Sequence, residues 1–226
     1  MTWIKICGTT NLEDAELAVE AGADAVGFVF YERSPRNIDP DTAREVVDKL
    51  PSKVEKIGVF VNATAAQVSK IARDAGITGV QLHADFSRPA CNTERDGLCW
   101  AGRTFFSLPA EILLGKEEEW IGLAKSELGL PGQMGFHFDS RTQQLPGGTG
   151  QAFDWEGAKP AITAISRNAR VVVAGGLNAD NVAQAIRTLS PWGVDVASGV
   201  EAKPGKKDPA KVRAFVEAVR AAEKNN

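Results

Sequence analysis

The chain has 226 residues, of which 43% are hydrophobic and 24% are charged, a composition typical of globular proteins. Its net charge of −3 at pH 7 provides no basic surface for nucleic acid, and no apolar run is long enough to cross a membrane. We therefore expect a globular protein that binds neither nucleic acid nor a membrane.

Cysteine and histidine are scarce in the chain. Its three cysteines, Cys7, Cys91 and Cys99, are an odd number without metal-ligand spacing, and the two histidines leave little room for a histidine-based metal centre. Reduced thiols in a cytoplasm fit this pattern best. The first residues also lack the charged and apolar regions of a signal peptide, so we expect a cytoplasmic protein.

The first part of the chain alternates between strand and helix signals. An apolar run over 3–6 predicts a strand, and Thr10 followed by Glu13 predicts a capping box for a helix that ends at Gly22. The apolar run over 25–30 is typical of a strand buried on both faces. The elements expected next are a helix over 40–50, a strand over 56–61, a helix opened by a capping box at Thr64 and ended by Gly76, and a strand over 79–83.

The later part continues the alternation after residues 85–102, to which we assign no element. Asp208 and Pro209 predict the start of the last helix, as an N-cap followed by proline at the first helical position. The other elements expected here are strands over 104–108, 134–138, 171–174 and 194–197, a helix over 116–128, and a helix capped by Asn178.

Eight strands that alternate with helices predict an α/β fold with a parallel sheet, because parallel neighbours need a crossover. Eight such units over residues 1–226, without a linker rich in proline or serine, favour a single (β/α)₈ TIM barrel in one domain. A doubly wound sheet is the alternative. It usually has fewer strands and often a Gly-x-Gly-x-x-Gly turn, which is missing here.

Active sites of such barrels lie at the carboxyl ends of the strands, so the residues that follow each apolar run matter most. The amino ends of the strands carry no comparable groups, and this asymmetry indicates an enzyme. The groups at the carboxyl ends are Cys7-Gly8, Ser34-Pro35-Arg36, His83, Asp139-Ser140 with Gly147-Gly148-Thr149-Gly150, Gly175-Gly176-Leu177-Asn178, and Ser198-Gly199-Val200-Glu201.

The two last loops indicate phosphate binding. Glycines at Gly175, Gly176 and Gly199 let the backbone approach a ligand closely, and the loops after strands seven and eight often hold phosphate in these barrels. The alternative is that the paired glycines only turn the chain. Arg36, fixed behind Pro35, can hold a carboxylate through a two-pronged hydrogen bond, and a surface salt bridge is its alternative.

Cys7 and Lys5 share one face of the first strand, because alternate residues of a strand point the same way. A lysine beside a cysteine at a strand end favours the thiolate. The alternative is a buried cysteine that acts as a small hydrophobic residue. A buried Lys5 needs a partner, and our candidate is Asp195 on the neighbouring last strand (a hypothesis).

An ordered series of motifs resembles the phosphoribosylanthranilate isomerase family of tryptophan biosynthesis. The resemblance runs from Lys5 to about Asp208, and although each motif is weak alone, the ordered set is highly specific. The motifs are Lys5-Ile6-Cys7-Gly8, Ser34-Pro35-Arg36, Gly58-Val59-Phe60-Val61-Asn62, Val80-Gln81-Leu82-His83, Asp139-Ser140, Gly147-Gly148-Thr149-Gly150, Ala174-Gly175-Gly176-Leu177 and Val194-Asp195-Val196-Ala197-Ser198-Gly199-Val200-Glu201.

The resemblance implies an Amadori rearrangement of the phosphosugar N-(5-phosphoribosyl)anthranilate, without metal or cofactor, in which Cys7 is the base and Asp139 the acid. Cys7 needs help to ionise, which Lys5 can supply, and the pKa of Asp139 must rise. We expect Arg36, Gly148, Gly175, Gly176, Ser198 and Gly199 to bind substrate, with Lys5, Gln81, His83 and Asp195 in support.

Some features depart from the family pattern. His137 stands where the family has an apolar residue, and we interpret it as a neutral core histidine. Ala197-Ser198 replaces two serines. The alternatives are a related phosphosugar-barrel enzyme, against which Cys7 argues, and a silent phosphate-binding subunit, against which the set of Cys7, Asp139 and Arg36 argues. No helix shows a clear exposed apolar face, so we expect a monomer rather than a homodimer.

Overall fold

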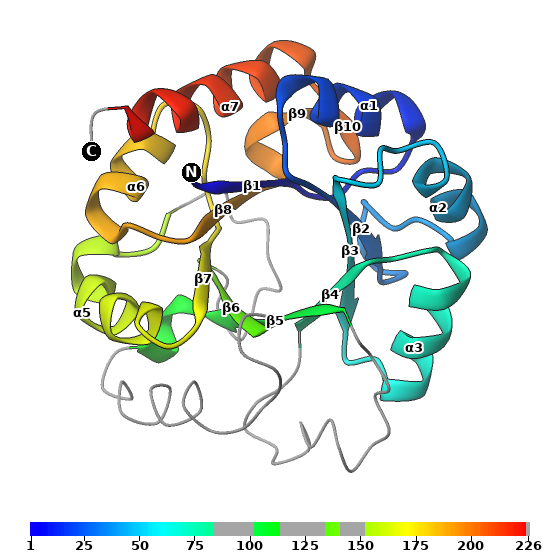
Figure 1. Cartoon of the computed structure of the whole chain (residues 1–226), viewed down its shortest axis with the longest axis horizontal. Helices are drawn as coiled ribbons and strands as arrows, with labels where there is room; N and C mark the ends of the chain where they lie inside the picture. The colour runs from blue at the N-terminus through cyan, green and yellow to red at the C-terminus, as the bar shows by residue number, and fades with distance from the viewer. Residues whose placement is uncertain (84–101, 114–133, 141–151, 225–226) are drawn as a thin grey trace.

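The computed structural model describes residues 1–83, 102–113, 134–140 and 152–224. Their strands form a closed parallel barrel in the order β1 to β8, which confirms the predicted (β/α)₈ fold (Figure 1). The strands are β1 (Trp3–Ile6), β2 (Ala25–Phe30), β3 (Glu55–Val61), β4 (Gly79–His83), β5 (Arg103–Pro109), β6 (Met134–Asp139), β7 (Arg170–Val173) and β8 (Gly193–Val196).

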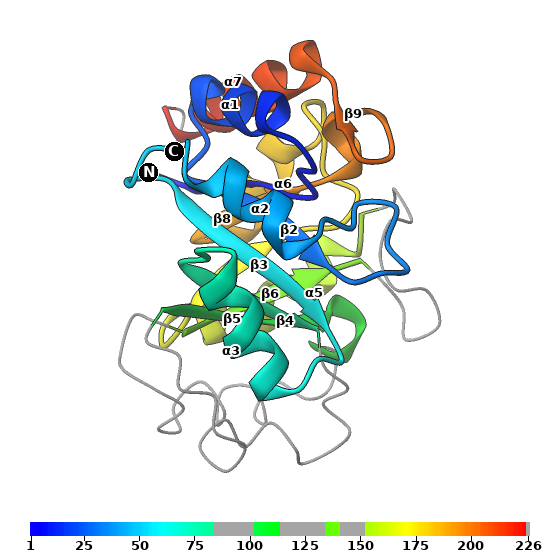
Figure 2. The same ribbon diagram turned by 90° about the vertical axis from the view of Figure 1, so that its right-hand side faces the viewer.

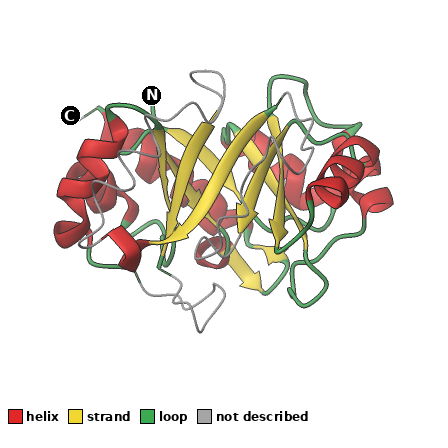
Figure 3. Ribbon diagram, turned by 90° about the horizontal axis from the view of Figure 1, so that it is seen from below, coloured by secondary structure: helices red, strands yellow, loops and turns green. Residues whose placement is uncertain are grey.

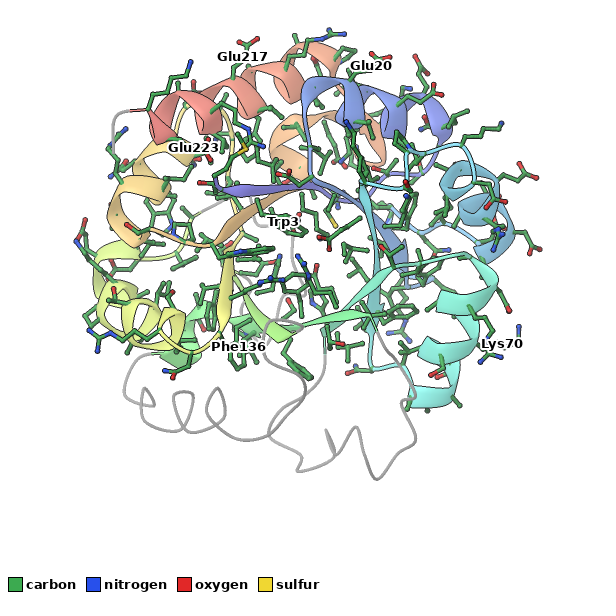
Figure 4. All side chains as sticks on the ribbon, in the orientation of Figure 1. Trp3, Glu20, Lys70, Phe136, Glu217 and Glu223 are labelled. Carbon is green, nitrogen blue, oxygen red and sulfur yellow. The ribbon has the colours of Figure 1, made fainter. Side chains whose placement is uncertain are left out.

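Helices surround the barrel on its outside (Figures 1 and 3). Glu20, Lys70 and Glu217 lie on the outer faces of three of these helices and point away from the strands (Figure 4). The α-helices are α1 (Leu12–Ala21), α2 (Pro40–Val47), α3 (Ala65–Asp74), α5 (Trp155–Ser166), α6 (Val182–Leu189) and α7 (Pro209–Glu223), and two short 3₁₀ helices are η1 (Ala110–Leu113) and η2 (Ser198–Val200). None of the described helices is both long and apolar enough to span a membrane.

The core has two parts, because alternate residues of each strand face the barrel interior or the helices. On β1, Ile4 and Ile6 pack in the large cluster between sheet and helices. Trp3 instead belongs to a smaller cluster with Ala25, Ile57, Phe105 and Val172. One residue from each of five strands thus fills the amino end of the barrel interior, and the following inward positions lie toward the carboxyl ends.

Most predicted elements are confirmed, with boundaries that differ by at most three residues. The helix expected over 40–50 ends at Val47. The helix expected over 116–128 lies outside the described residues, as do the Gly147–Gly150 loop, Cys91, Cys99 and almost all of the unassigned 85–102 stretch.

Two predicted helix caps are wrong. The N-cap of α1 is Asn11, whose side chain accepts a hydrogen bond from the Asp14 amide, because Thr10 instead donates its hydroxyl to the carbonyl of Gly205 at 2.8 Å. The N-cap of α6 is Asn181, while Asn178 accepts amide hydrogen bonds in the turn before it. The capping box at Thr64, the left-handed stop at Gly22 and the Asp208 cap are confirmed.

A two-stranded hairpin, β9 (Glu201–Lys203) and β10 (Lys206–Lys207), stands between η2 and α7 and was not expected. Gly205 makes its turn with φ of 80°. The last helix, α7, also packs against the start of the chain, where Arg220 donates a 2.7 Å hydrogen bond to the carbonyl of Thr2. Figure 2 shows α7 and α1 on the same side of the barrel. The hairpin and α7 therefore both return to β1.

Replacing Asp208 by alanine should lower the free energy of unfolding by about 1 kcal/mol, because its carboxylate accepts from the amides of Ala210 and Lys211 at the start of α7. Chemical denaturation measures the change. Glu217→Ala, on the exposed face of the same helix, is the control and should change stability by less than about 0.5 kcal/mol. An equal loss in both variants would contradict the capping role.

Candidate active site

A buried polar layer fills the barrel interior above the apolar cluster at its amino end. It consists of Lys5, Gln81, Ser107, His137 and Asp195, each with 6% or less of its surface exposed. These residues come from β1, β4, β5, β6 and β8, which the closed sheet brings together. The layer therefore lies directly below the strand ends where the candidate catalytic residues were expected.

Lys5 is the centre of this layer. Its ammonium donates to Asp195 Oδ2 at 2.9 Å and to Gln81 Oε1 at 2.7 Å, which confirms the expected pairing of Lys5 with Asp195. The parallel register of β1 and β8 places these two residues opposite each other. Burial works against the charged amine, but Asp195 and Cys7 raise the pKa of Lys5 above its ordinary value.

His137 shares the same carboxylate. Its Nε2 lies 2.7 Å from Asp195 Oδ2 and its Nδ1 lies 3.2 Å from Ser107 Oγ. Burial alone would raise the pKa of Asp195, but Lys5 and His137 lower it to about 2. His137 is buried as expected, and it holds the carboxylate that partners Lys5.

Gln81 and His83 extend the layer upward along β4. The side-chain amide of Gln81 lies 3.0 Å from His83 Nε2, and the same Gln81 accepts from Lys5. Hydrogen bonds thus connect all four residues that we expected in supporting roles, Lys5, Gln81, His83 and Asp195.

Cys7 lies at the end of β1 and is 8% exposed. A methyl group at Gly27 of β2 would come within 2.7 Å of Cys7 Sγ and 2.9 Å of Lys5 Cε, so both side chains lie over the same glycine, on the shared face that we expected. Burial raises the pKa of the thiol, and it stays raised although Lys5 lowers it. Lys5 therefore favours the thiolate as expected, but desolvation outweighs the ammonium, and the net pKa of Cys7 is raised.

Arg36 lies against the end of β1. Its Cδ would be 2.5 Å from a methyl group at Gly8, which has φ of 75°, so the absence of a side chain at Gly8 makes room for it. Its guanidinium forms a two-pronged ion pair with Glu201, with distances of 2.8 Å from Nε to Oε1 and 2.7 Å from Nη2 to Oε2. Arg36 thus holds a carboxylate through a two-pronged hydrogen bond, as predicted, but in this structure the carboxylate is that of Glu201.

The sequence analysis named Glu201 after the last strand without giving it a role, and it missed Lys207. Lys207 is 1% exposed, and its ammonium donates to the carbonyl of Cys7 at 2.6 Å and to Glu201 Oε1 at 3.2 Å. The available signal was Pro204-Gly205, a turn sequence three residues after the end of the strand-eight motif at Glu201, which predicts a hairpin.

The loops after β6, β7 and β8 are in direct contact. A methyl group at Gly175 would lie 2.7 Å from Asp139 Oδ1 and 2.3 Å from the Ser140 amide nitrogen. A methyl group at Gly199 would lie 1.9 Å from the carbonyl oxygen of Leu177. Both loop glycines, Gly175 and Gly176, have positive φ, of 80° and 63°. The β7 loop is therefore wedged between Asp139 and the Ser198–Gly199 turn.

These contacts bring most of the predicted site residues to one end of the barrel. Cys7 and Asp139 lie at the ends of β1 and β6, which β7 and β8 separate in the closed sheet. Ser198 is exposed beside the β7 loop. Gly148 lies outside the described residues.

The amino ends of the strands are not bare, contrary to our expectation. Arg103 and Arg170 begin β5 and β7, and their guanidinium carbons lie 5.1 Å and 4.7 Å from the ring centroid of Trp192. Trp192 stacks on Trp3, and Arg103 pairs with Glu55 at 2.9 Å. These groups lie at the amino end of the barrel, the end that serves stability rather than catalysis in this fold.

Comparison with known proteins identifies the family. The family model of N-(5'-phosphoribosyl)anthranilate (PRA) isomerase matches residues 4–108 and 131–218. The chain belongs to this family. The N-(5'-phosphoribosyl)anthranilate isomerase of Citrifermentans bemidjiense is 42% identical over 216 residues, covering 96% of each chain. That of Geobacter sp. strain M21 is 43% identical, covering 96% of this chain and 97% of its own.

Solved structures of PRA isomerases agree. The enzyme from Thermotoga maritima superposes with a TM-score of 0.82 at 34% identity, covering 98% of this chain and all of that one. A PRA isomerase in complex with reduced 1-(o-carboxyphenylamino)-1-deoxyribulose 5-phosphate has a TM-score of 0.78 at 33% identity, with the same coverage. The fold of this chain is thus that of the PRA isomerases.

Asp195→Asn should lower the pKa of Cys7, because the carboxylate opposes the thiolate and competes for the Lys5 ammonium. Alkylation of Cys7 by iodoacetamide at pH 7, followed on the Cys7 peptide by mass spectrometry, should be faster than in the wild type. Asp24→Asn is the control. Its carboxylate binds the Ile4 amide and Arg220 rather than Lys5, so this variant should be alkylated at the wild-type rate. Slower alkylation in folded Asp195→Asn would contradict this electrostatic balance.

Gly175→Ala should lower turnover by the PRA isomerase, because the new methyl group would displace Asp139 and Ser140. The left-handed backbone adds strain of about 1 kcal/mol or more. Gly22→Ala is the matched control: it has φ of 100°, but its methyl group would meet only Val216 at 3.6 Å, on the outside of the barrel. We expect both variants to lose stability and only Gly175→Ala to lose kcat.

Proposed function

We propose that this protein converts N-(5'-phosphoribosyl)anthranilate, an aminoaldose, into 1-(2-carboxyphenylamino)-1-deoxyribulose 5-phosphate, an aminoketose, in tryptophan biosynthesis. Membership of the PRA isomerase family supports the reaction. The observation that carries the residue assignment is the position of Cys7, buried at the end of β1 beside the paired ammonium of Lys5. We assign Cys7 as the base and Asp139 as the acid.

The rearrangement needs two proton transfers and no external oxidant. Asp139 donates a proton to the ribose ring oxygen, so the C1–O bond breaks and the ring opens to a Schiff base. Cys7 then removes the proton from C2. The electron pair of the broken C2–H bond forms the C1–C2 double bond of an enolamine. Tautomerisation of the enolamine gives the ketone at C2, so C1 is reduced while C2 is oxidised.

Each group needs a particular environment for this role. The Cys7 thiolate is stabilised by the ammonium groups of Lys5 and Lys207, which both lower a pKa that burial raises. Asp139 must hold its proton near neutral pH, and the phosphate and carboxylate of the substrate supply negative charge that favours the protonated acid. The glycine loops at 175–176 and 198–199 are the proposed phosphate site, since Gly175 packs against Asp139 and Gly199 packs against Leu177, and a glycine backbone lets an anion approach its amides closely.

The other assignments follow from this placement. Arg36 binds the substrate carboxylate, and Gly148 is proposed on sequence grounds alone. The oligomeric state stays a prediction: the sequence favours a monomer, whereas a related enzyme from Thermotoga maritima is described as dimeric.

A coupled assay tests the function. The substrate is made in place from anthranilate and phosphoribosyl pyrophosphate, and its isomerisation is followed by loss of anthranilate-type fluorescence. Wild type should turn over rapidly, and Cys7→Ser and Asp139→Asn should each lose about 10² to 10⁴ in kcat, the usual contribution of a general base or acid.

Asp41→Asn, an exposed position on α2, is the control and should keep full activity. Full activity in Cys7→Ser would remove the proposed base and leave the isomerase reaction in place. A folded wild type that binds phosphate without turnover would overturn the proposal and favour a silent phosphate-binding subunit.

A further inference from the structure

Glu201 is a buried carboxylate that the proposed mechanism does not use. It begins β9, directly after the Ser198–Val200 turn, and its side chain is 4% exposed. Burying a carboxylate is costly unless it is paired, and Glu201 has two cationic partners, Arg36 and Lys207. Burial alone would raise the pKa of Glu201, but these partners lower it below its ordinary value, so the group is ionised at neutral pH.

Glu201 binds one particular edge of Arg36. A guanidinium has two forks: a side edge formed by Nε and one Nη, and an end formed by the two Nη atoms. Glu201 accepts from Nε and Nη2 and so occupies the side edge. Within the described part of the chain, Nη1 of Arg36 makes no hydrogen bond. The N–H groups of the end fork can therefore still donate to a ligand.

Lys207 keeps this arrangement positively charged. One carboxylate between two cations leaves a net charge of +1, so Glu201 does not cancel the attraction of Arg36 for an anion. The hairpin register places Lys207 opposite Glu201, and the same ammonium holds the carbonyl of Cys7. The orientation of the Arg36 fork and the backbone position of Cys7 are therefore fixed by one buried lysine.

Arg36 has little freedom to turn elsewhere. Its stem lies over Gly8, the residue that follows Cys7, and its backbone amide donates to Ser34 Oγ at 3.1 Å. Its side chain is 17% exposed, so the guanidinium is mostly enclosed and still reachable. A carboxylate bound at its end fork would lie beside the end of β1.

We propose that Glu201 and Lys207 are positioning residues that aim the end fork of Arg36 at the carboxylate of the aminobenzoate ring, and so make the enzyme selective for aryl amines that carry this group. The inference rests on the proposed function. It adds that selectivity resides in the Arg36–Glu201–Lys207 ion cluster, in which Arg36 binds the substrate carboxylate and neither Glu201 nor Lys207 touches the substrate.

Two stable probes separate this role from catalysis. Reductive amination of ribose 5-phosphate with anthranilate or with aniline gives a pair of amines that differ only in the carboxylate. Calorimetry measures the Kd of both for wild type and Glu201→Gln. We expect Glu201→Gln to raise the Kd of the carboxylate probe by about tenfold or more, the size of a lost charge-assisted hydrogen bond. The Kd of the aniline probe should change by less than about twofold.

Glu13→Gln is the matched control. Glu13 pairs with Lys206 of the same hairpin, but its side chain is 84% exposed and it does not contact Arg36, so both probes should bind as in wild type. Glu201→Asp provides a second variant if Glu201→Gln does not fold. It keeps the buried charge for Lys207 but is one methylene shorter, and it should also weaken only the carboxylate probe.

The outcomes are separable. The positioning role would be overturned if a folded Glu201 variant bound both probes more weakly by the same factor, or bound both as tightly as wild type does. Wild type that binds both probes equally would overturn the selectivity itself. Wild-type turnover in the coupled assay tests the proposed function independently, since a protein without turnover can still discriminate between the two probes.

Discussion

The site depends on one buried ion pair, between Lys5 and Asp195. A lysine with 1% of its surface exposed is stable as a cation only if its ammonium is paired and hydrogen-bonded. The neighbouring strands β1 and β8 supply the carboxylate in register, and Gln81 supplies the second acceptor. The middle of the barrel must then be polar rather than apolar, which explains why the apolar interior cluster is confined to the amino end.

Glycines determine how closely the proposed catalytic residues pack against the neighbouring backbone. Gly27 admits both Cys7 and Lys5 over the face of β2, and Gly175 admits Asp139 against the β7 loop. In each case a single methyl group would come within 3 Å of the functional atoms. The absence of a side chain therefore contributes to the site as directly as the reactive side chains do.

Strand order and the inward positions of Lys5 and Asp195 could be predicted from the sequence, because apolar runs and a period of two determine them. The Arg36–Glu201–Lys207 cluster could not. Its members are 165 and 6 residues apart along the chain, and they meet only because a short hairpin folds back over β1. Thr10 failed as a cap for the same reason, since that hairpin offers its hydroxyl a better acceptor. Sequence patterns predict partners that are close along the chain, whereas the partners of Arg36 and Thr10 are brought to them only by the tertiary fold.

The raised pKa of Cys7 is compatible with its proposed role as the base. Burial and Asp195 favour the neutral thiol, so the resting enzyme keeps Lys5 paired to its carboxylate. A thiolate that forms in this environment is a stronger base than one in water, because the factors that raise its pKa also increase its affinity for a proton. Removing a proton from carbon requires such a base. Lys5 and Lys207 limit the free energy needed to form it, and the balance between burial and these two ammonium groups sets the fraction of enzyme that is ready to react.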